Sequence, residues 1–168
     1  MSLIFLPDTP RDCVKDAVVI SGPESFLFGG RVFLLHSDDD IREAYEIRCE
    51  RDQSTFAQAE MLGNLLVAGY GQKFYMFDTT RQAPLLALTL DWYFCHFWVE
   101  DNRIYVTGAS AMYCIDMTGT VHWNTANLGI DGVIINQFTP TQIEGSGEWD
   151  PPGGWKDFSL DKQTGQLL

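Results

Sequence analysis

The feature that most restricts the fold of this chain is an internal repeat of about forty residues. When the sequence is shifted by 38 residues, Tyr75 meets Tyr113 and Asp78 meets Asp116. Further identities at the same shift are Phe56 with Phe94, Asn64 with Asn102 and Thr80 with Thr118. Self-similarity at a fixed period is typical of arrays in which each unit packs on the next. The sequence therefore predicts a repeat architecture.

Each repeat contains short β-strands separated by turns. Runs rich in Val, Ile, Phe, Tyr and Trp alternate with Gly, Asn and Asp, which is the pattern of strands and tight turns. The predicted strands are Ala17–Ile20, Arg31–His36, Thr55–Leu62, Leu65–Tyr70, Lys73–Phe77, Leu85–Leu90, Tyr93–Val99, Arg103–Thr107, Ala111–Ile115, Thr120–Trp123, Val133–Phe138, Gln142–Glu144 and Asp157–Leu160. A four-strand antiparallel unit of about forty residues has the size of one propeller blade.

We therefore predict an all-β fold, a propeller-like array of about four antiparallel β-meander repeats in a single domain over residues 1–168. An open two-sheet β-sandwich is the alternative, because it has the same rhythm of strands and turns. A further alternative is a part-propeller that is completed by forming a homodimer, because an open array leaves strand edges that need covering. Residues 38–51 fit a helix or a strand by periodicity, and the repeat favours a strand over residues 44–50.

A block of motifs between residues 101 and 123 consists of Asp101–Val106, Ala111–Asp116, Thr118-Gly119 and Trp123. This block resembles one blade of the quinoprotein-type (PQQ-like) β-propeller repeat, and Phe158–Asp161 with Thr164-Gly165 is a partial second match. The resemblance implies that the Asp and Thr-Gly form a turn between outer strands, and that the Trp docks between neighbouring blades. The family's cofactor-binding residues have no counterparts that can be placed on this chain, so we expect no cofactor.

The charge of the chain restricts its partners. Eleven Lys and Arg residues against 23 Asp and Glu residues give a formal net charge of −12. Such a chain repels phosphate backbones and anionic membrane surfaces, which excludes nucleic acid and membrane as favoured partners. A protein with a basic surface is the partner that this charge favours, since complementary charge speeds association.

The cysteines and the N-terminus predict a cytoplasmic protein with reduced thiols. Cys13, Cys49, Cys95 and Cys114 are widely spaced and form no CxxC pair. A chain of 168 residues with 45% hydrophobic residues can form a core without disulfides. The apolar run near the N-terminus has no basic residue before it and is too short for a secretory signal.

No catalytic or metal-binding motif stands out. His36, His96 and His122 are not at close metal-ligand spacing, and the chain lacks a GxSxG elbow and a phosphate-binding glycine loop. His96 is the best functional candidate of the three, because Trp92, Cys95 and Trp98 surround it. The strand Tyr93–Val99 is largely apolar on both faces, however, so a buried His96 is the simpler interpretation. We expect a protein without a metal site and without enzymatic activity.

The most distinctive stretch runs from Glu144 to Trp155 and combines carboxylates, tryptophans, prolines and glycines. Prolines restrict the backbone and glycines allow close approach, so we predict one shaped loop. Carboxylates beside indole rings can bind a basic side chain, a cation or a sugar. The candidate binding residues are Glu148, Trp149, Asp150 and Trp155, with Asp131 and His96. In the competing interpretation the tryptophans only cap the β-core.

Residues 123–165 also resemble uncharacterised bacterial proteins without an assigned activity, a resemblance carried by Asn127–Ile135 and the DPPGGW sequence. It favours a bacterial, non-enzymatic protein. The leading hypothesis is a protein-binding module, such as an immunity- or antitoxin-like partner of a basic protein. The alternative is a carbohydrate-binding or glycan-processing domain that uses the segment Glu148–Trp155.

Overall fold

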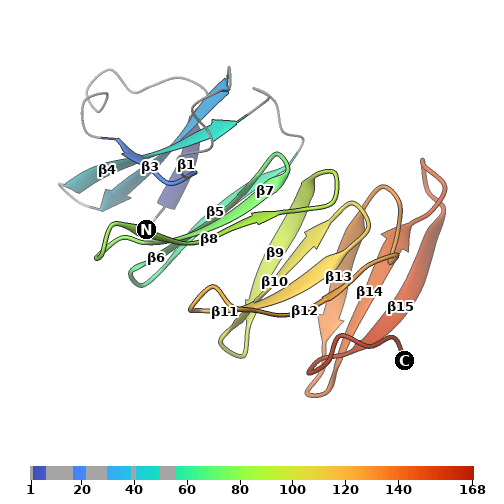
Figure 1. Cartoon of the computed structure of the whole chain (residues 1–168). Helices are drawn as coiled ribbons and strands as arrows, with labels where there is room; N and C mark the ends of the chain where they lie inside the picture. The colour runs from blue at the N-terminus through green and yellow to red at the C-terminus, as the bar shows by residue number, and fades with distance from the viewer. Residues whose placement is uncertain (1, 7–16, 22–29, 39–40, 50–55) are drawn as a thin grey trace. The chain divides into compact units, whose positions relative to one another are not determined.

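The computed structural model describes residues 2–6, 17–21, 30–38, 41–49 and 56–168, and its regular structure there is entirely β-strand (Figure 1). Within these described ranges, fifteen strands form four sheets. The predicted all-β, propeller-like fold is confirmed, and four sheets rather than two exclude the β-sandwich. The chain divides into two compact units, Met1–Leu88 and Thr89–Leu168. Its description as one domain stays a prediction.

The first unit holds two four-stranded sheets. Its strands are β1 (Ser2–Leu6), β2 (Val18–Val19), β3 (Gly30–Asp38), β4 (Ile41–Cys49), β5 (Ala57–Leu62), β6 (Leu65–Tyr70), β7 (Lys73–Asp78) and β8 (Ala83–Thr89). The first sheet has the order β1-β3-β4-β2, with β2 parallel to β4, and the second is a meander from β5 to β8. A core of Leu34, Tyr45 and Ile47 with Leu66 and Phe77 joins the two sheets.

Two sequence predictions in the first unit are decided by the structure. Residues 41–49 form the strand β4, so the preference for a strand is confirmed and the helix alternative is wrong. Within this strand Ala44, Tyr45, Glu46 and Ile47 are all buried. Glu46 lies at 6% exposure and accepts a hydrogen bond of 2.9 Å from Arg48 Nε. The N-terminal apolar run, which was not predicted as a strand, forms β1.

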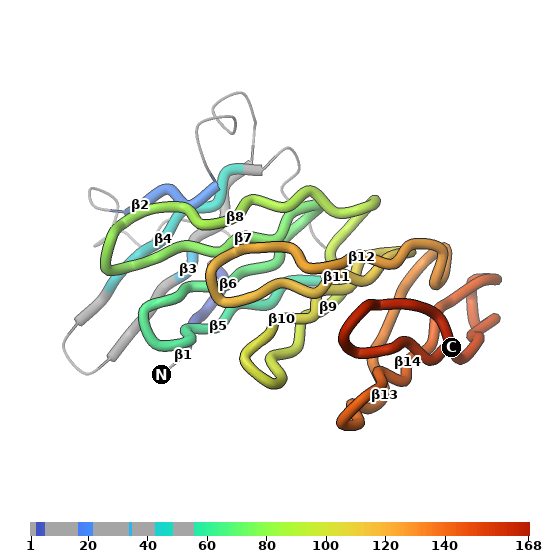
Figure 2. The backbone as a smooth tube through the Cα atoms, turned by 60° about the horizontal axis from the view of Figure 1, so that its bottom comes forward, coloured from blue at the N-terminus to red at the C-terminus, as the bar shows by residue number. Residues whose placement is uncertain are grey.

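The second unit holds two antiparallel meanders, which can be followed in Figure 2. The strands of the third sheet are β9 (Phe94–Glu100), β10 (Arg103–Gly108), β11 (Met112–Asp116) and β12 (Val121–Thr125). The fourth sheet contains β13 (Val133–Phe138), β14 (Gln142–Glu148) and β15 (Trp155–Asp161). Its only further pairing among the described residues is the single bridge from Leu160 to Leu167.

The third and fourth sheets pack through one apolar core. The third sheet contributes Tyr105, Met112 and Cys114, and the fourth contributes the fully buried Val133, Ile143 and Leu160 among others. The Tyr105 ring lies 5.0 Å from that of Phe138 across the interface. Burying such side chains stabilises each sheet pair by about 1.5–3 kcal/mol per residue relative to exposure.

Trp123 docks in this interface, as the resemblance to propeller repeats implied. Its ring lies 6.0 Å from Tyr105 and packs against the core of the two sheets. The turn after β15 closes over it, because a Cβ on Gly165 would lie 2.5 Å from the indole. Thr125 Oγ1 donates a 2.6 Å hydrogen bond to the Gly165 carbonyl and fixes this contact.

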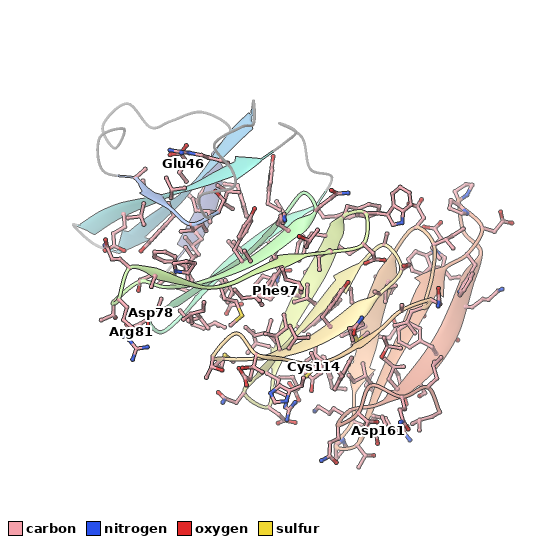
Figure 3. All side chains as sticks on the ribbon, viewed as in Figure 1. Glu46, Asp78, Arg81, Phe97, Cys114 and Asp161 are labelled. Carbon is pink, nitrogen blue, oxygen red and sulfur yellow. The ribbon has the colours of Figure 1, made fainter. Side chains whose placement is uncertain are left out.

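An aspartate ends the third strand of three sheets and organises the turn that follows. Asp116 Oδ1 accepts hydrogen bonds from the Thr118 amide at 2.8 Å, the Thr118 hydroxyl at 2.6 Å and the Thr120 amide at 3.0 Å. Asp161 Oδ1 accepts the Thr164 amide at 2.7 Å. Asp78 Oδ1 accepts the Arg81 amide at 2.9 Å, and both residues are labelled in Figure 3. The predicted Asp and Thr-Gly turns are therefore confirmed.

The strand β9 contains a β-bulge opposite Thr107 and Gly108. The bulge places two residues of β9 against one of β10. Phe94 and Cys95, the two residues at the bulge, are both buried. In the regular part of the strand, His96 is exposed and Val99 is 37% exposed. The interpretation of His96 as a core residue is therefore wrong.

In β14 the predicted strand end at Glu144 is also wrong. The sequence Gly145-Ser-Gly147 continues the strand to Glu148 instead of opening a loop. The glycine at 147 is needed because a Cβ there would overlap the Leu128 carbonyl. The segment before β13 can thus lie directly against the backbone of β14.

The cysteines in the described part of the second unit carry free thiols. Cys95 and Cys114 are both buried and unpaired by disulfides. Cys13 lies outside the described residues. Burial raises the pKa of Cys95 to about 11, so the thiol stays protonated near neutral pH.

We expect Gly165→Ala to lower the free energy of unfolding by about 2 kcal/mol or more. The Cβ meets Trp123, and the residue has a φ of +72° that favours glycine. Gly63→Ala is the matched control, since its φ is +62° but nothing lies within 4 Å of the added Cβ. Gly63→Ala should lower the free energy of unfolding by only about 1 kcal/mol. Equal losses in denaturant unfolding of the two variants would contradict the docking of Trp123 under this turn.

We expect Asp116→Asn to destabilise the protein by about 1 kcal/mol near neutral pH. The hydrogen bonds from Thr118 hold the pKa of Asp116 well below its ordinary value, and His122 lowers it further. The carboxylate therefore stabilises the fold fully above the ordinary aspartate pKa of about 3.9, and this stabilisation fades as the pH falls below it. Unfolding measured as a function of pH should show a constant difference between the two proteins down to about pH 4 and a shrinking difference below it. Asp150→Asn, at an exposed position, is the control and should show no such pattern.

Candidate functional site

The β14–β15 connection is a short turn whose shape is fixed by its own hydrogen bonds. Glu148 ends β14 and pairs directly with Trp155, which begins β15. The Trp149 amide donates to the Gly154 carbonyl at 2.9 Å, and the Gly153 amide donates to Glu148 Oε1 at 2.9 Å. The predicted shaped loop is therefore shorter than the stretch from Glu144, and both of its ends belong to strands.

Asp131 is brought to this turn by backbone contacts. The Ile130 and Asp131 amides donate to the Glu148 carbonyl at 2.7 and 3.3 Å, and the Glu148 amide donates to the Gly132 carbonyl at 2.9 Å. The segment that precedes β13 is thus bonded to the end of β14. We use the name acidic turn for Glu148–Trp155 together with Asp131.

Tyr93 anchors the acidic turn from the segment before β9. Its hydroxyl lies 2.7 Å from both the carbonyl and Oδ1 of Asp131, and it donates to this pair of oxygens. Burial and the hydrogen bond to Asp131 raise the pKa of Tyr93 above its ordinary value. The phenol is therefore a permanent donor at neutral pH.

The two indoles of the acidic turn differ in accessibility. Trp155 is 44% exposed, whereas Trp149 is half-buried and Lys156 Nζ lies 5.0 Å from its ring centroid. An ammonium over an indole face is attracted by the ring quadrupole. Trp155 consequently presents the more accessible aromatic surface, with the exposed carboxylates of Asp131 and Asp150 in the same turn.

Five of the six predicted binding residues belong to this one region, and His96 does not. The exposed His96 ring lies 4.5 Å from Trp98 and 6.5 Å from Phe97. Desolvation lowers the pKa of His96 below its ordinary value, so the ring is predominantly neutral near pH 7. His96 is an exposed strand residue with an aromatic neighbour, and its membership of the binding site stays a prediction.

Sequence reasoning missed Tyr93 and Lys156 as members of the region. Tyr93 was predicted only as part of an apolar strand, and Lys156 was not singled out. Their roles depend on contacts made by folding, such as the approach of Tyr93 to a residue 38 positions later. A local motif carries no signal for such a contact.

Among the described residues, no three His, Cys, Asp or Glu side chains form a group that could hold a metal ion. The described part of the chain also contains no helix with the length and apolarity to span a membrane.

Comparison with known proteins supports the fold and assigns no family. No family model matches the chain, and no curated protein sequence matches it. A similar solved structure is BamB from Moraxella catarrhalis, a β-propeller with PQQ-like repeats, at 14% sequence identity and a TM-score of 0.55. The similarity covers all of this chain and 50% of the BamB chain, so this chain spans half of that protein's length. At this identity the likeness shows a propeller-like β-fold alone.

We expect Tyr93→Phe to lower the free energy of unfolding by about 1 kcal/mol, because the hydroxyl contact with Asp131 is partly exposed. A double-mutant cycle with Asp131→Ala isolates the side-chain part of the contact. A positive coupling energy in the cycle is expected from urea unfolding. Strict additivity of the two losses would show that the side chain of Asp131 does not hold Tyr93.

Proposed function

We propose that this protein is a non-enzymatic binding module that engages a basic partner protein through the acidic turn. The observation that carries the proposal is the 44% exposed Trp155, paired with Glu148 in a turn fixed by hydrogen bonds. Rigid, exposed tryptophans are frequent anchors of protein interfaces. Because the turn is already ordered, binding costs less conformational entropy than ordering a flexible loop would.

The charge of the chain supports a basic partner. The formal net charge of −12 steers a positively charged protein toward this one and makes the association rate sensitive to salt. An arginine side chain suits this region, since it can stack on the indole while pairing with Asp131, Glu148 or Asp150. Immunity proteins and antitoxins that neutralise basic toxins have this charge relation, and we propose this class of role in a bacterial cell.

Carbohydrate binding is the second candidate, favoured by the exposed Trp155 beside carboxylates. Sugars commonly stack on an indole face while polar groups hold their hydroxyls. One observation argues for the protein partner: Lys156 lies over the Trp149 ring, so the region does not offer two equally accessible indoles. A glycan array with the wild-type protein discriminates the two, because the protein-binding proposal expects no sugar-specific signal there.

We expect Trp155→Ala to abolish capture of a basic partner from a lysate of the source cell at low and moderate salt. Loss of an interface tryptophan costs about 2 kcal/mol or more, or about thirtyfold in affinity. Trp92→Ala is the matched control, since Trp92 is the more exposed tryptophan of the second unit at 72%. Equal capture by wild type and Trp155→Ala would remove the acidic turn as the binding site. Loss in both variants would indicate a general effect of removing an exposed indole.

A further inference from the structure

The two faces of the fourth sheet differ in chemistry. Residues directly opposite each other in an antiparallel pair lie on the same face. Ile135, Phe138, Ile143, Phe158 and Leu160 lie on the face that packs against the third sheet. The other face, which we call the outer face, carries Ile134, Gln137, Glu144, Ser146, Glu148, Trp155, Asp157 and Ser159.

The outer face can be compared position by position with the third sheet, because Asp116 and Asp161 end equivalent strands. Two residues before each aspartate stand Cys114 and Ser159, and four residues before stand Met112 and Asp157. The cross-strand partner of Cys114 is Tyr105, and that of Ser159 is Glu144. In the next strand Tyr105 pairs with Trp98, and Glu144 pairs with Gln137.

At every one of these positions the third sheet has an apolar residue and the fourth sheet has a polar one. In the third sheet Trp98, Tyr105, Met112 and Cys114 face the fourth sheet and form the interface between the two. The equivalent residues of the fourth sheet are Gln137, Glu144, Asp157 and Ser159. The second sheet retains the apolar pattern, with Val67, Phe74 and Met76 at three of these positions. The outer face therefore lacks the apolar side chains with which the third sheet packs against the fourth sheet.

Polar side chains on the outer face are arranged across all three strands. Asn136 Nδ2 donates to Ser146 Oγ at 2.7 Å, and Ser146 Oγ donates to Asp157 Oδ1 at 2.8 Å. This chain of hydrogen bonds holds the Asp157 carboxylate in a fixed position on β15, an edge strand of the sheet. Ile134 and Trp155 are 40% and 44% exposed on the same face, and Glu144 and Asp157 are exposed beside them.

The charges of the outer face have one sign. Glu144, Glu148 and Asp157 are acidic, and none of the outer-face residues is Lys or Arg. Lys156 pairs with Gly147 on the opposite face. Ordinary solvated surfaces mix both signs. A face with carboxylates, fixed amide and hydroxyl groups and two exposed apolar side chains suits a polypeptide that brings cationic side chains with apolar stems.

We infer that the outer face of the fourth sheet is the docking surface for an arginine- and lysine-bearing polypeptide, and is not an interface for another sheet of the repeat. The inference rests on the proposed function and extends it from the acidic turn to the sheet. Trp155 belongs to both regions, so a partner anchored there lies along β14 and β15 toward Glu144. Arginine suits the surface better than lysine, because its planar group pairs with a carboxylate and stacks on an indole at once.

The test is a titration of the isotope-labelled full chain, followed by amide and indole NMR signals. The probes are short synthetic peptides of alternating arginine and threonine, with lysine–threonine and glutamate–threonine peptides as charge controls. We expect the arginine peptide to shift the amides of Ile134, Glu144, Ser146 and Asp157 and the indole of Trp155. The glutamate peptide should shift none of them, and the lysine peptide should bind more weakly than the arginine peptide.

Matched variants separate a specific surface from general attraction to an acidic protein. Glu144→Gln and Glu60→Gln remove the same charge from exposed strand positions, the second of them in β5 of the first unit. We expect Glu144→Gln to weaken binding of the arginine peptide by about fivefold. Glu60→Gln should weaken it by less than about twofold. Equal effects of the two variants, or shifts spread over acidic residues of the whole chain, would overturn the inference.

Two further outcomes distinguish this inference from the proposed function. Shifts confined to Asp131 and residues 148–154, with no effect of Glu144→Gln, overturn the outer face and leave the acidic turn as the site. Concentration-dependent self-association that broadens the outer-face signals also overturns the inference, because a second copy of the chain is then the occupant. Failure of Trp155→Ala to affect partner capture counts against the proposed function itself.

Discussion

The packing of the third sheet on the fourth is the interaction on which the second unit depends. Tyr105, Met112 and Cys114 meet Ile143 and other apolar residues across it. A sheet buries one face in such a contact and leaves the other to be covered or made polar. The outer face of the fourth sheet is polar, and the acidic turn joins the last residue of β14, Glu148, to the first residue of β15, Trp155. The core therefore determines which carboxylates of the fourth sheet lie on its exposed face.

The acidic composition has two physical roles in this chain. Asp78, Asp116 and Asp161 accept hydrogen bonds from turn amides, so their carboxylates stabilise connections between strands. Asp131 and Glu148 also take part in local hydrogen bonds, but they lie where the surface presents Trp155. Net charge alone cannot separate these roles, since both contribute equally to it. Hydrogen-bond partners and neighbouring apolar surface separate them.

The repeat could be predicted because its signals are local. The spacing of Asp78 and Asp116, the Thr-Gly sequences and Trp123 each indicate a turn or a docking position within a few residues, and the structure has them there. Long-range effects account for the failures. Gly147 lies in a strand where the backbone at Leu128 approaches too closely for a side chain, and His96 is exposed although the apolar residues around it predicted burial. The membership of Tyr93 in the candidate site depends on a contact of the same kind.

The outer face also shows why residue types at repeat positions are more informative than composition. Glu144 and Asp157 are ordinary surface residues by type, and acidic surfaces also serve solubility. At their positions the preceding sheet has Tyr105 and Met112, which are buried against a neighbouring sheet. A sheet face that is exposed to water needs polar residues to stay soluble, and mixed charges meet that need. The outer face goes beyond that need, since its carboxylates have no Lys or Arg on the same face and repel one another.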